Sequence, residues 1–169
     1  MRPLTNEAWG FSSNCFVCEP TNDRGLRIPF FHDEEAGAVR AEISLGPAFS
    51  GAPRYLHGGV VLAVLDEAMA WAAIALAARF AVTRTTTATF EHPVRVGQPY
   101  RVEAHIEALV DQEIRASAEV MDADGRCCAK AQAALVPLGP AQAADAVGEE
   151  VSGEASRLLC PPGPAGTGA

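Results

Sequence analysis

The sequence predicts an α+β domain in which one antiparallel sheet of five to six strands wraps around a single long helix. Several stretches alternate apolar and polar residues with a period of two, which is typical of half-buried strands. One stretch, residues 58–78, is apolar on nearly all sides. The chain has 169 residues, 49% of them hydrophobic, which suits one core and is too short for two ordinary domains. We expect this domain over residues 1–138, with residues 1–25 as an N-terminal extension.

Two strands are expected before the helix, a short one around Leu26, Ile28 and Phe30 and a second over residues 39–45. Four are expected after it, over residues 83–90, 100–108, 113–120 and 129–135. The first of these four is rich in threonine, which packs well on a pleated surface. A turn rich in Asp and Gly at residues 122–125 separates the last two. The alternating strands over residues 39–45, 100–108, 113–120 and 129–135 are expected to be antiparallel neighbours.

The central helix is predicted over residues 58–78, which contain good helix formers, no proline and no glycine after Gly59. A helix without a polar face must be buried on most sides. At about 1.5 Å per residue it would be ~30 Å long. We therefore place it inside the curled sheet.

Asp66 and Glu67 are the only ionisable residues in this stretch. Consecutive residues are about 100° apart around a helix axis, so the two side chains cannot point the same way. One can reach solvent or a partner, while the other must face the core. There a carboxylate is costly unless it is hydrogen-bonded, protonated or used in chemistry. The alternative is that both lie on a solvent-facing stripe.

The helix is expected to begin at His57, Gly58 and Gly59. The first N–H groups of a helix have no internal partner and carry the positive end of the helix dipole. Two glycines allow a ligand to approach this backbone closely. Such a site binds an anion or stabilises an oxyanion, with one positioned donor worth about 3 kcal/mol in a transition state. The alternative is a glycine-rich turn with His57 as a capping residue.

Charge and composition exclude several classes of protein. The formal net charge is −8 and the isoelectric point is near 4.9, which argues against a nucleic-acid partner. The first residues lack the apolar segment of a secretory signal, and no uncharged stretch reaches the roughly 18 residues of a membrane span. We therefore expect a cytoplasmic protein without a membrane partner. Residues 139–169 are rich in Ala, Gly and Pro and are expected to form a mobile tail.

The five cysteines include a C-x-x-C pair, Cys15 and Cys18. Such a pair is half of a zinc site or a redox pair. A zinc site needs about four ligands, and Cys127, Cys128 and Cys160 supply no second C-x-x-C. We therefore expect reduced thiols, no metal and no cofactor.

Four segments together resemble a known family, that of hotdog-fold acyl-CoA thioesterases, in the PaaI-like branch of the 4-hydroxybenzoyl-CoA thioesterase superfamily. The segments are residues 57–59 (His-Gly-Gly), 65–69 (Leu-Asp-Glu-Ala-Met), 14–18 (Asn-Cys-Phe-Val-Cys) with Asn22, Gly25 and Leu26, and 93–97 (Pro-Val-Arg-Val-Gly). Their order and spacing cover about residues 14–138. The resemblance implies a hotdog fold.

The resemblance also implies roles for individual residues. In similar enzymes the acid nine residues after the motif histidine acts as general base or nucleophile toward the thioester, and here it is Asp66. Gly58 matches the glycine whose amide polarises the thioester carbonyl, and His57 supports that loop. A second polar group often comes from the strand after the helix, where Thr83 is the closest match and Thr85 the alternative.

Further substrate contacts are expected from Gly59 and Glu67, with Thr85 and Arg54. Arg54 replaces a common glycine of the family and would meet a CoA phosphate or an acidic acyl group. The alternative for Arg54 is a solvated loop arginine.

The spacing of Gly58 and Asp66 bears on assembly. They are eight residues apart, or ~12 Å along one helix, whereas a base and an oxyanion donor must both lie within roughly 3 Å of one reaction centre or its attacking water. Two antiparallel helices related by a two-fold axis can supply both, and the resemblance implies a dimer. We expect a homodimer with two equivalent sites, each using Gly58 of one chain and Asp66 of the other. Pairing of dimers into a homotetramer stays open.

The expected activity is hydrolysis of an acyl-CoA to a free acid and CoA. A non-catalytic acyl-CoA binder, acting as sensor or carrier, is the alternative. Hotdog hydratases, a second enzymatic alternative, carry a different pattern of histidine and acidic residues, which this sequence lacks.

Overall fold

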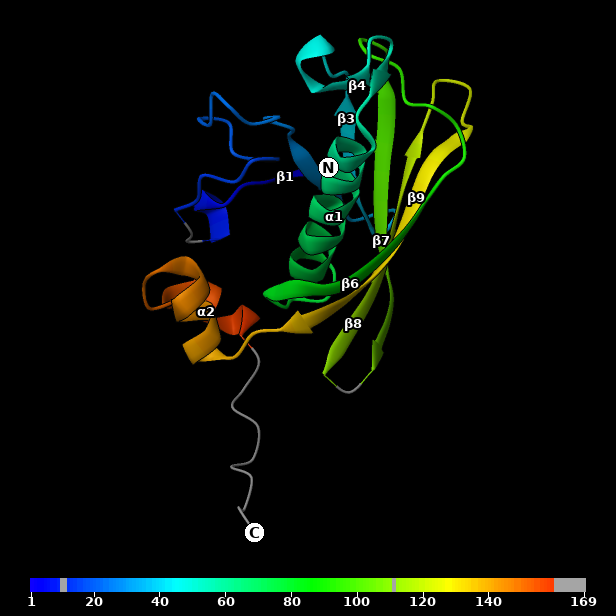
Figure 1. Cartoon of the computed structure of the whole chain (residues 1–169). Coiled ribbons are helices and arrows are strands. Elements are labelled where there is room, and N and C mark those ends of the chain that lie inside the picture. Colours follow the sequence, from blue (N-terminus) through cyan, green and yellow to red (C-terminus); the bar gives the residue numbers. More distant parts are fainter. Residues whose placement is uncertain (10–11, 111, 160–169) are drawn as a thin grey trace.

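One antiparallel sheet dominates the structure, a computed structural model that describes residues 1–9, 12–110 and 112–159. Its seven strands lie in the order β1-β2-β3-β7-β8-β9-β6 (Figure 1). The sheet strands are β1 (Arg2–Leu4), β2 (Phe30–Asp33), β3 (Ala38–Ile43), β6 (Ala81–Phe90), β7 (Tyr100–Val110), β8 (Glu113–Met121) and β9 (Cys127–Pro137). A separate hairpin pairs β4 (Ser50–Ala52) with β5 (Tyr55–Leu56). The helical elements are α1 (Gly58–Ala75), α2 (Pro140–Val147) and the short 3-10 helices η1 (Glu7–Trp9), η2 (Pro47–Phe49) and η3 (Gly153–Leu158).

Helix α1 is the centre of the fold, and the sheet curves around one side of it (Figure 1). Large apolar side chains of α1, among them Leu65, Met69 and Trp71, are buried. They belong to one hydrophobic core with the strand residues, many of which are small. The small buried strand residues include Ala104 of β7, Ala116 and Ala118 of β8, and Ala129, Ala131 and Ala133 of β9. The predicted architecture is confirmed, with seven sheet strands rather than five to six because β1 pairs with β2.

Helix α1 also has the length and hydropathy of a membrane span, the one such helix among the residues described. Half of its residues are buried inside the domain. The core helix of a globular domain passes the same test, so this property is explained by its place in the fold.

The first predicted strand differs in detail. Strand β2 begins only at Phe30. The residues before it are hydrogen-bonded to the loop that carries Cys15 and Cys18. Leu26 N donates to Phe16 O at 2.7 Å, and Ile28 N donates to Val17 O at 2.9 Å. These two bonds fix the cysteine loop to the chain that enters the sheet.

Residues 139–159 differ from the expected mobile tail. They form α2 and η3, and Phe80 N donates to Leu158 O at 2.8 Å. Ala143 and Leu158 are buried. Pro140 occupies the first turn of α2 and Gly148, at φ +84°, ends it, so the local sequence does carry helix boundaries. The rest of the predicted tail, residues 160–169, lies outside the described residues.

Candidate active site

Asp66 lies at the middle of α1, half-buried, where the helix meets the edge strand β6. Thr83 Oγ1 donates a hydrogen bond of 2.9 Å to Asp66 Oδ1. The β6–β9 register shifts between Thr83 and Thr85, and Thr85 is exposed. The hydroxyl holds one carboxylate oxygen, and no described residue hydrogen-bonds the other. Of the two threonines named by the resemblance, the structure brings Thr83 to Asp66.

His57 organises the start of α1. It is the N-cap residue, and its Nδ1 accepts a hydrogen bond of 2.9 Å from Gly59 N. Its carbonyl oxygen accepts from Val60 N at 2.9 Å and from Val61 N at 3.1 Å. No acceptor for the Gly58 N–H is found among the described residues, as expected for the first turn of a helix. The His57 side chain therefore occupies the Gly59 amide and leaves the Gly58 amide for a ligand.

The two glycines differ in the space around them. A Cβ on Gly59 would lie 3.1 Å from His57 Nδ1, which is a tight contact. A Cβ on Gly58 would meet only the Phe90 ring, at 3.8 Å. The His57 cap therefore requires a glycine at position 59, whereas the space beside Gly58 would admit a larger residue or a ligand.

A pocket of about 280 Å³ adjoins Gly58. Its walls include Tyr55, Val61 and the half-exposed ring of Phe90. The Arg95 guanidinium lies over the Tyr55 ring, 5.5 Å from its centre, at a distance typical of a cation–π contact. Arg54 is exposed in the turn of the β4–β5 hairpin. This end of α1 offers an apolar pocket with arginines of the same segment nearby.

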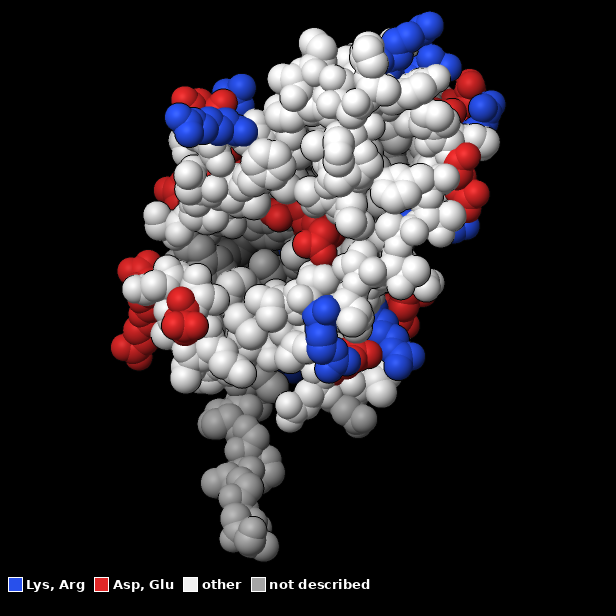
Figure 2. Space-filling model, in the orientation of Figure 1, with Lys and Arg blue, Asp and Glu red and all other residues white. Residues whose placement is uncertain are grey.

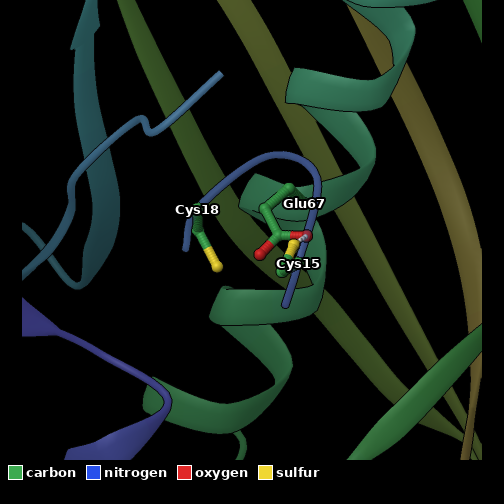
Figure 3. Close-up of side chains that lie close together, drawn as sticks. All are labelled: Cys15, Cys18 and Glu67. Carbon is green, nitrogen blue, oxygen red and sulfur yellow. Dashed lines mark hydrogen bonds between the residues drawn. The ribbon is translucent and has the colours of Figure 1, made fainter. Parts of the chain in front are cut away.

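Glu67 leaves the helix in another direction. Cys15 Sγ donates to Glu67 Oε2 at 3.4 Å, and Cys18 lies beside them (Figure 3). Burial, together with the neighbouring Cys15, raises the pKa of Glu67 to about 7. Hydrogen bonds from Cys18 and from nearby backbone lower the pKa of Cys15 to about 5. The two carboxylates diverge as predicted, and both are half-buried.

The contact between Glu67 and the cysteine loop was not predicted from the sequence. It joins residues 52 positions apart, and the hydrophobic pattern of the helix carries no signal for it. The sequence named both features, the C-x-x-C pair and the second acid, but not their proximity.

The open face of α1 carries acidic groups. Figure 2 shows Asp and Glu side chains at the centre of this face, beside a hollow between the N-terminal segment and the C-terminal helices. Lys and Arg side chains lie nearer its edges (Figure 2). The charged centre of the face is therefore open to an approaching molecule.

Part of the sequence is similar to a known superfamily. Residues 54–129, which contain the His57 cap, Asp66 and Thr83, match the sequence model of the thioesterase superfamily. No curated protein gave a significant match to the sequence.

Solved structures share the fold. A crystal structure described as a thioesterase superfamily protein has a TM-score of 0.69 at 21% identity; the match covers 73% of this chain but only 60% of that one. The E. coli PaaI protein from the phenylacetic acid degradation operon has a TM-score of 0.61 at 20% identity, covering 68% of this chain and 81% of that one. A Streptococcus mutans UA159 protein bound to acetyl CoA has a TM-score of 0.58 at 16% identity, covering 61% and 82%. Together with the sheet wrapped around α1, these structures show that the chain has the hotdog fold. Its residues 54–129 are similar to the thioesterase superfamily, and the PaaI protein is among its structural neighbours.

Proposed function

We propose that this protein is a PaaI-like acyl-CoA thioesterase in which Asp66 is the catalytic carboxylate. The observation that carries the proposal is the 2.9 Å hydrogen bond from Thr83 to Asp66. A hydroxyl that fixes one oxygen of a carboxylate sets the direction of the other, and a base or nucleophile needs a fixed direction. The acetyl CoA bound to the S. mutans relative supports a CoA thioester as substrate.

The chemistry needs two groups. Asp66 removes a proton from water as the water attacks the thioester carbon, or attacks that carbon itself. In both routes the carbonyl oxygen gains negative charge, and the Gly58 N–H at the positive end of α1 stabilises it. The carbon–sulfur bond then breaks, and CoA leaves as its thiol after taking up a proton. If Asp66 was the nucleophile, the acyl group is then held on it as an anhydride, which water hydrolyses to free acid and the Asp66 carboxylate.

The site requires a second copy of the chain. Within one helix the Gly58 amide and Asp66 are ~12 Å apart. Strand β6 is an edge of the sheet that pairs only with β9 among the described strands, and its Val82 and Phe90 side chains are 46% and 51% exposed. Strand β6 is ten residues long, and native proteins normally cover or block a sheet edge of this length. A homodimer joined along β6 would cover it and set two α1 helices side by side.

The direct test is an assay of thiol release over a panel of acyl-CoAs of different chain length and aromatic character. Wild-type protein is expected to release free CoA from at least one of them, and Asp66→Asn serves as the matched background. Saturable binding of acyl-CoA without release of thiol would favour the alternative, a sensor or carrier, over an enzyme.

A mixed dimer tests the shared site. Gly58→Pro removes the proposed oxyanion donor, and the extended backbone of His57 suits a following proline. Gly58→Ala is the control, because it keeps the amide and fits beside Phe90. Gly58→Pro and Asp66→Asn homodimers should each be inactive. After dissociation and equal mixing, activity should return to about one quarter of wild type, because half of the dimers carry one intact site. No recovery in dimers shown to have exchanged would contradict the shared site.

A further inference from the structure

The N-terminal loop and α1 bring three side chains of metal-binding chemistry together. The candidate ligand atoms of Cys15, Cys18 and Glu67 all lie within 4.8 Å of one another. Figure 3 shows the two thiols, on the loop, pointing toward the carboxylate on the helix. No other His, Cys, Asp or Glu joins this cluster in the part of the chain that the structure describes.

The spacing fits one metal ion. Zinc binds thiolate sulfur at about 2.3 Å and carboxylate oxygen at about 2.1 Å, so tetrahedral angles place sulfur and oxygen about 3.6 Å apart. The same geometry places two sulfurs about 3.8 Å apart. Cys15 Sγ and Glu67 Oε2 are 3.4 Å apart. Small adjustments of side chains already in contact would complete three sides of a zinc shell.

The loop backbone positions the sulfurs. Val17 N donates to Cys15 Sγ at 3.3 Å, and the Asn6 amide donates to Cys18 Sγ at 3.6 Å. Hydrogen bonds of this kind favour the thiolate form that metals bind and orient ligands around a metal centre. A Cβ on Gly25 would lie 2.6 Å from Phe16 O, so glycine there allows the chain to close against the turn. The loop therefore holds both sulfur atoms in position through these hydrogen bonds.

Charge also favours a cation. Glu67 is half-buried, and no Lys, Arg or His among the described residues forms an ion pair with it. A carboxylate beside two thiols lacks a compensating positive charge, and a divalent ion supplies one. Two thiolates select a soft or borderline metal, while the carboxylate suits zinc better than copper(I).

We propose that Cys15, Cys18 and Glu67 bind one zinc ion, which fixes the N-terminal loop to the middle of α1, with a water molecule as the fourth ligand. Zinc displaces whatever protons the two thiols and Glu67 carry, so binding releases protons, at most three for each zinc ion. The site uses none of the residues assigned to thioester hydrolysis by Asp66, Gly58 and Thr83.

The test is metal binding by the purified, reduced, metal-stripped full chain. Titration with zinc is expected to saturate at one ion per chain with release of protons. Cobalt(II) should give the visible spectrum of a tetrahedral site with a thiolate charge-transfer band. Cys15→Ser and Glu67→Gln should each weaken zinc binding at least about tenfold. Glu67→Gln preserves side-chain size, so it remains informative if the serine variant fails to fold.

Two controls separate this site from adventitious binding. Cys127→Ser removes a thiol outside the cluster, and Asp66→Asn removes the adjacent carboxylate. Both should bind zinc as wild type does. Equal zinc affinity in wild type and folded Glu67→Gln protein, or a cobalt spectrum without a thiolate band, would overturn the proposal.

Discussion

Asp66 and Glu67 are adjacent acids on one helix, yet they contact different parts of the molecule. Asp66 accepts a hydrogen bond from Thr83 on the edge strand β6. Glu67 contacts Cys15 on the N-terminal loop, and burial raises its pKa to about 7. The rotation of about 100° per residue assigns one carboxylate to the sheet edge and the other to the loop. Neighbouring groups of the same chemistry can therefore serve separate purposes within one helical turn.

The largest effect should come from Asp66. Asp66→Asn keeps the size of the side chain and removes its ability to accept a proton or attack, so kcat should fall at least about 100-fold. Steady-state thiol release measures it. Zinc affinity and the melting temperature should stay close to wild type, because the loop side of the helix is unchanged. An unaltered kcat would remove Asp66 from the mechanism.

The Glu67 side should affect stability. If zinc binds only the folded protein, an excess of about 100 Kd adds roughly 2.7 kcal/mol to the free energy of unfolding. For a chain of this size that corresponds to a rise in Tm of about 5–10 °C, measured by thermal unfolding with zinc and with a chelator. Folded Glu67→Gln protein, measured at the same zinc concentration, should show a smaller rise. An equal rise in Tm in both proteins would show that Glu67 does not bind the zinc ion.

A smaller effect is expected from the partner of Asp66. Thr83→Val removes the hydroxyl but keeps the branched shape that suits a strand. Loss of one hydrogen bond to a carboxylate is worth about 1.5 kcal/mol, so kcat should fall about tenfold. Thr87→Val is the matched control, since Thr87 is exposed on the same strand. Equal kcat in the two variants would show that the Thr83 hydroxyl does not position Asp66.

Much of the fold could be predicted from local patterns. Strands β3 and β7–β9 follow an alternation that a half-buried sheet imposes on the sequence, and the threonines of β6 mark it as a strand. The predicted helix extended to residue 78, but α1 ends at Ala75. Ala78 takes a positive φ of 52°, and Arg79 N donates to Ala73 O at 2.9 Å. A helix that ends in this left-handed conformation usually has glycine at that position. Because alanine stands there instead, the sequence gives no signal for the end of the helix.

Other features depend on contacts that local patterns do not record. The Ala, Gly and Pro content of residues 139–159 suggested a mobile tail, yet Gln142 Oε1 accepts from Gly139 N at 3.0 Å and caps α2. Leu158 then reaches the core. The family resemblance named Thr83 as a second polar group of the site, but not its hydrogen bond to Asp66. The meeting of Glu67 with Cys15 needed the folded chain, because tertiary structure alone brings the loop to the helix.

The alanines of the sheet set how closely α1 can approach it. Ala116, Ala118 and Ala131 are almost completely buried beneath the large side chains of the helix. Replacing one of them with leucine would act as a wedge, because a close-packed interior has no room for three more carbons. Asp66 would then be displaced from Thr83, whose hydrogen bond tolerates only a few tenths of an ångström. The small alanine side chains of the sheet therefore determine how precisely Asp66 is positioned against Thr83.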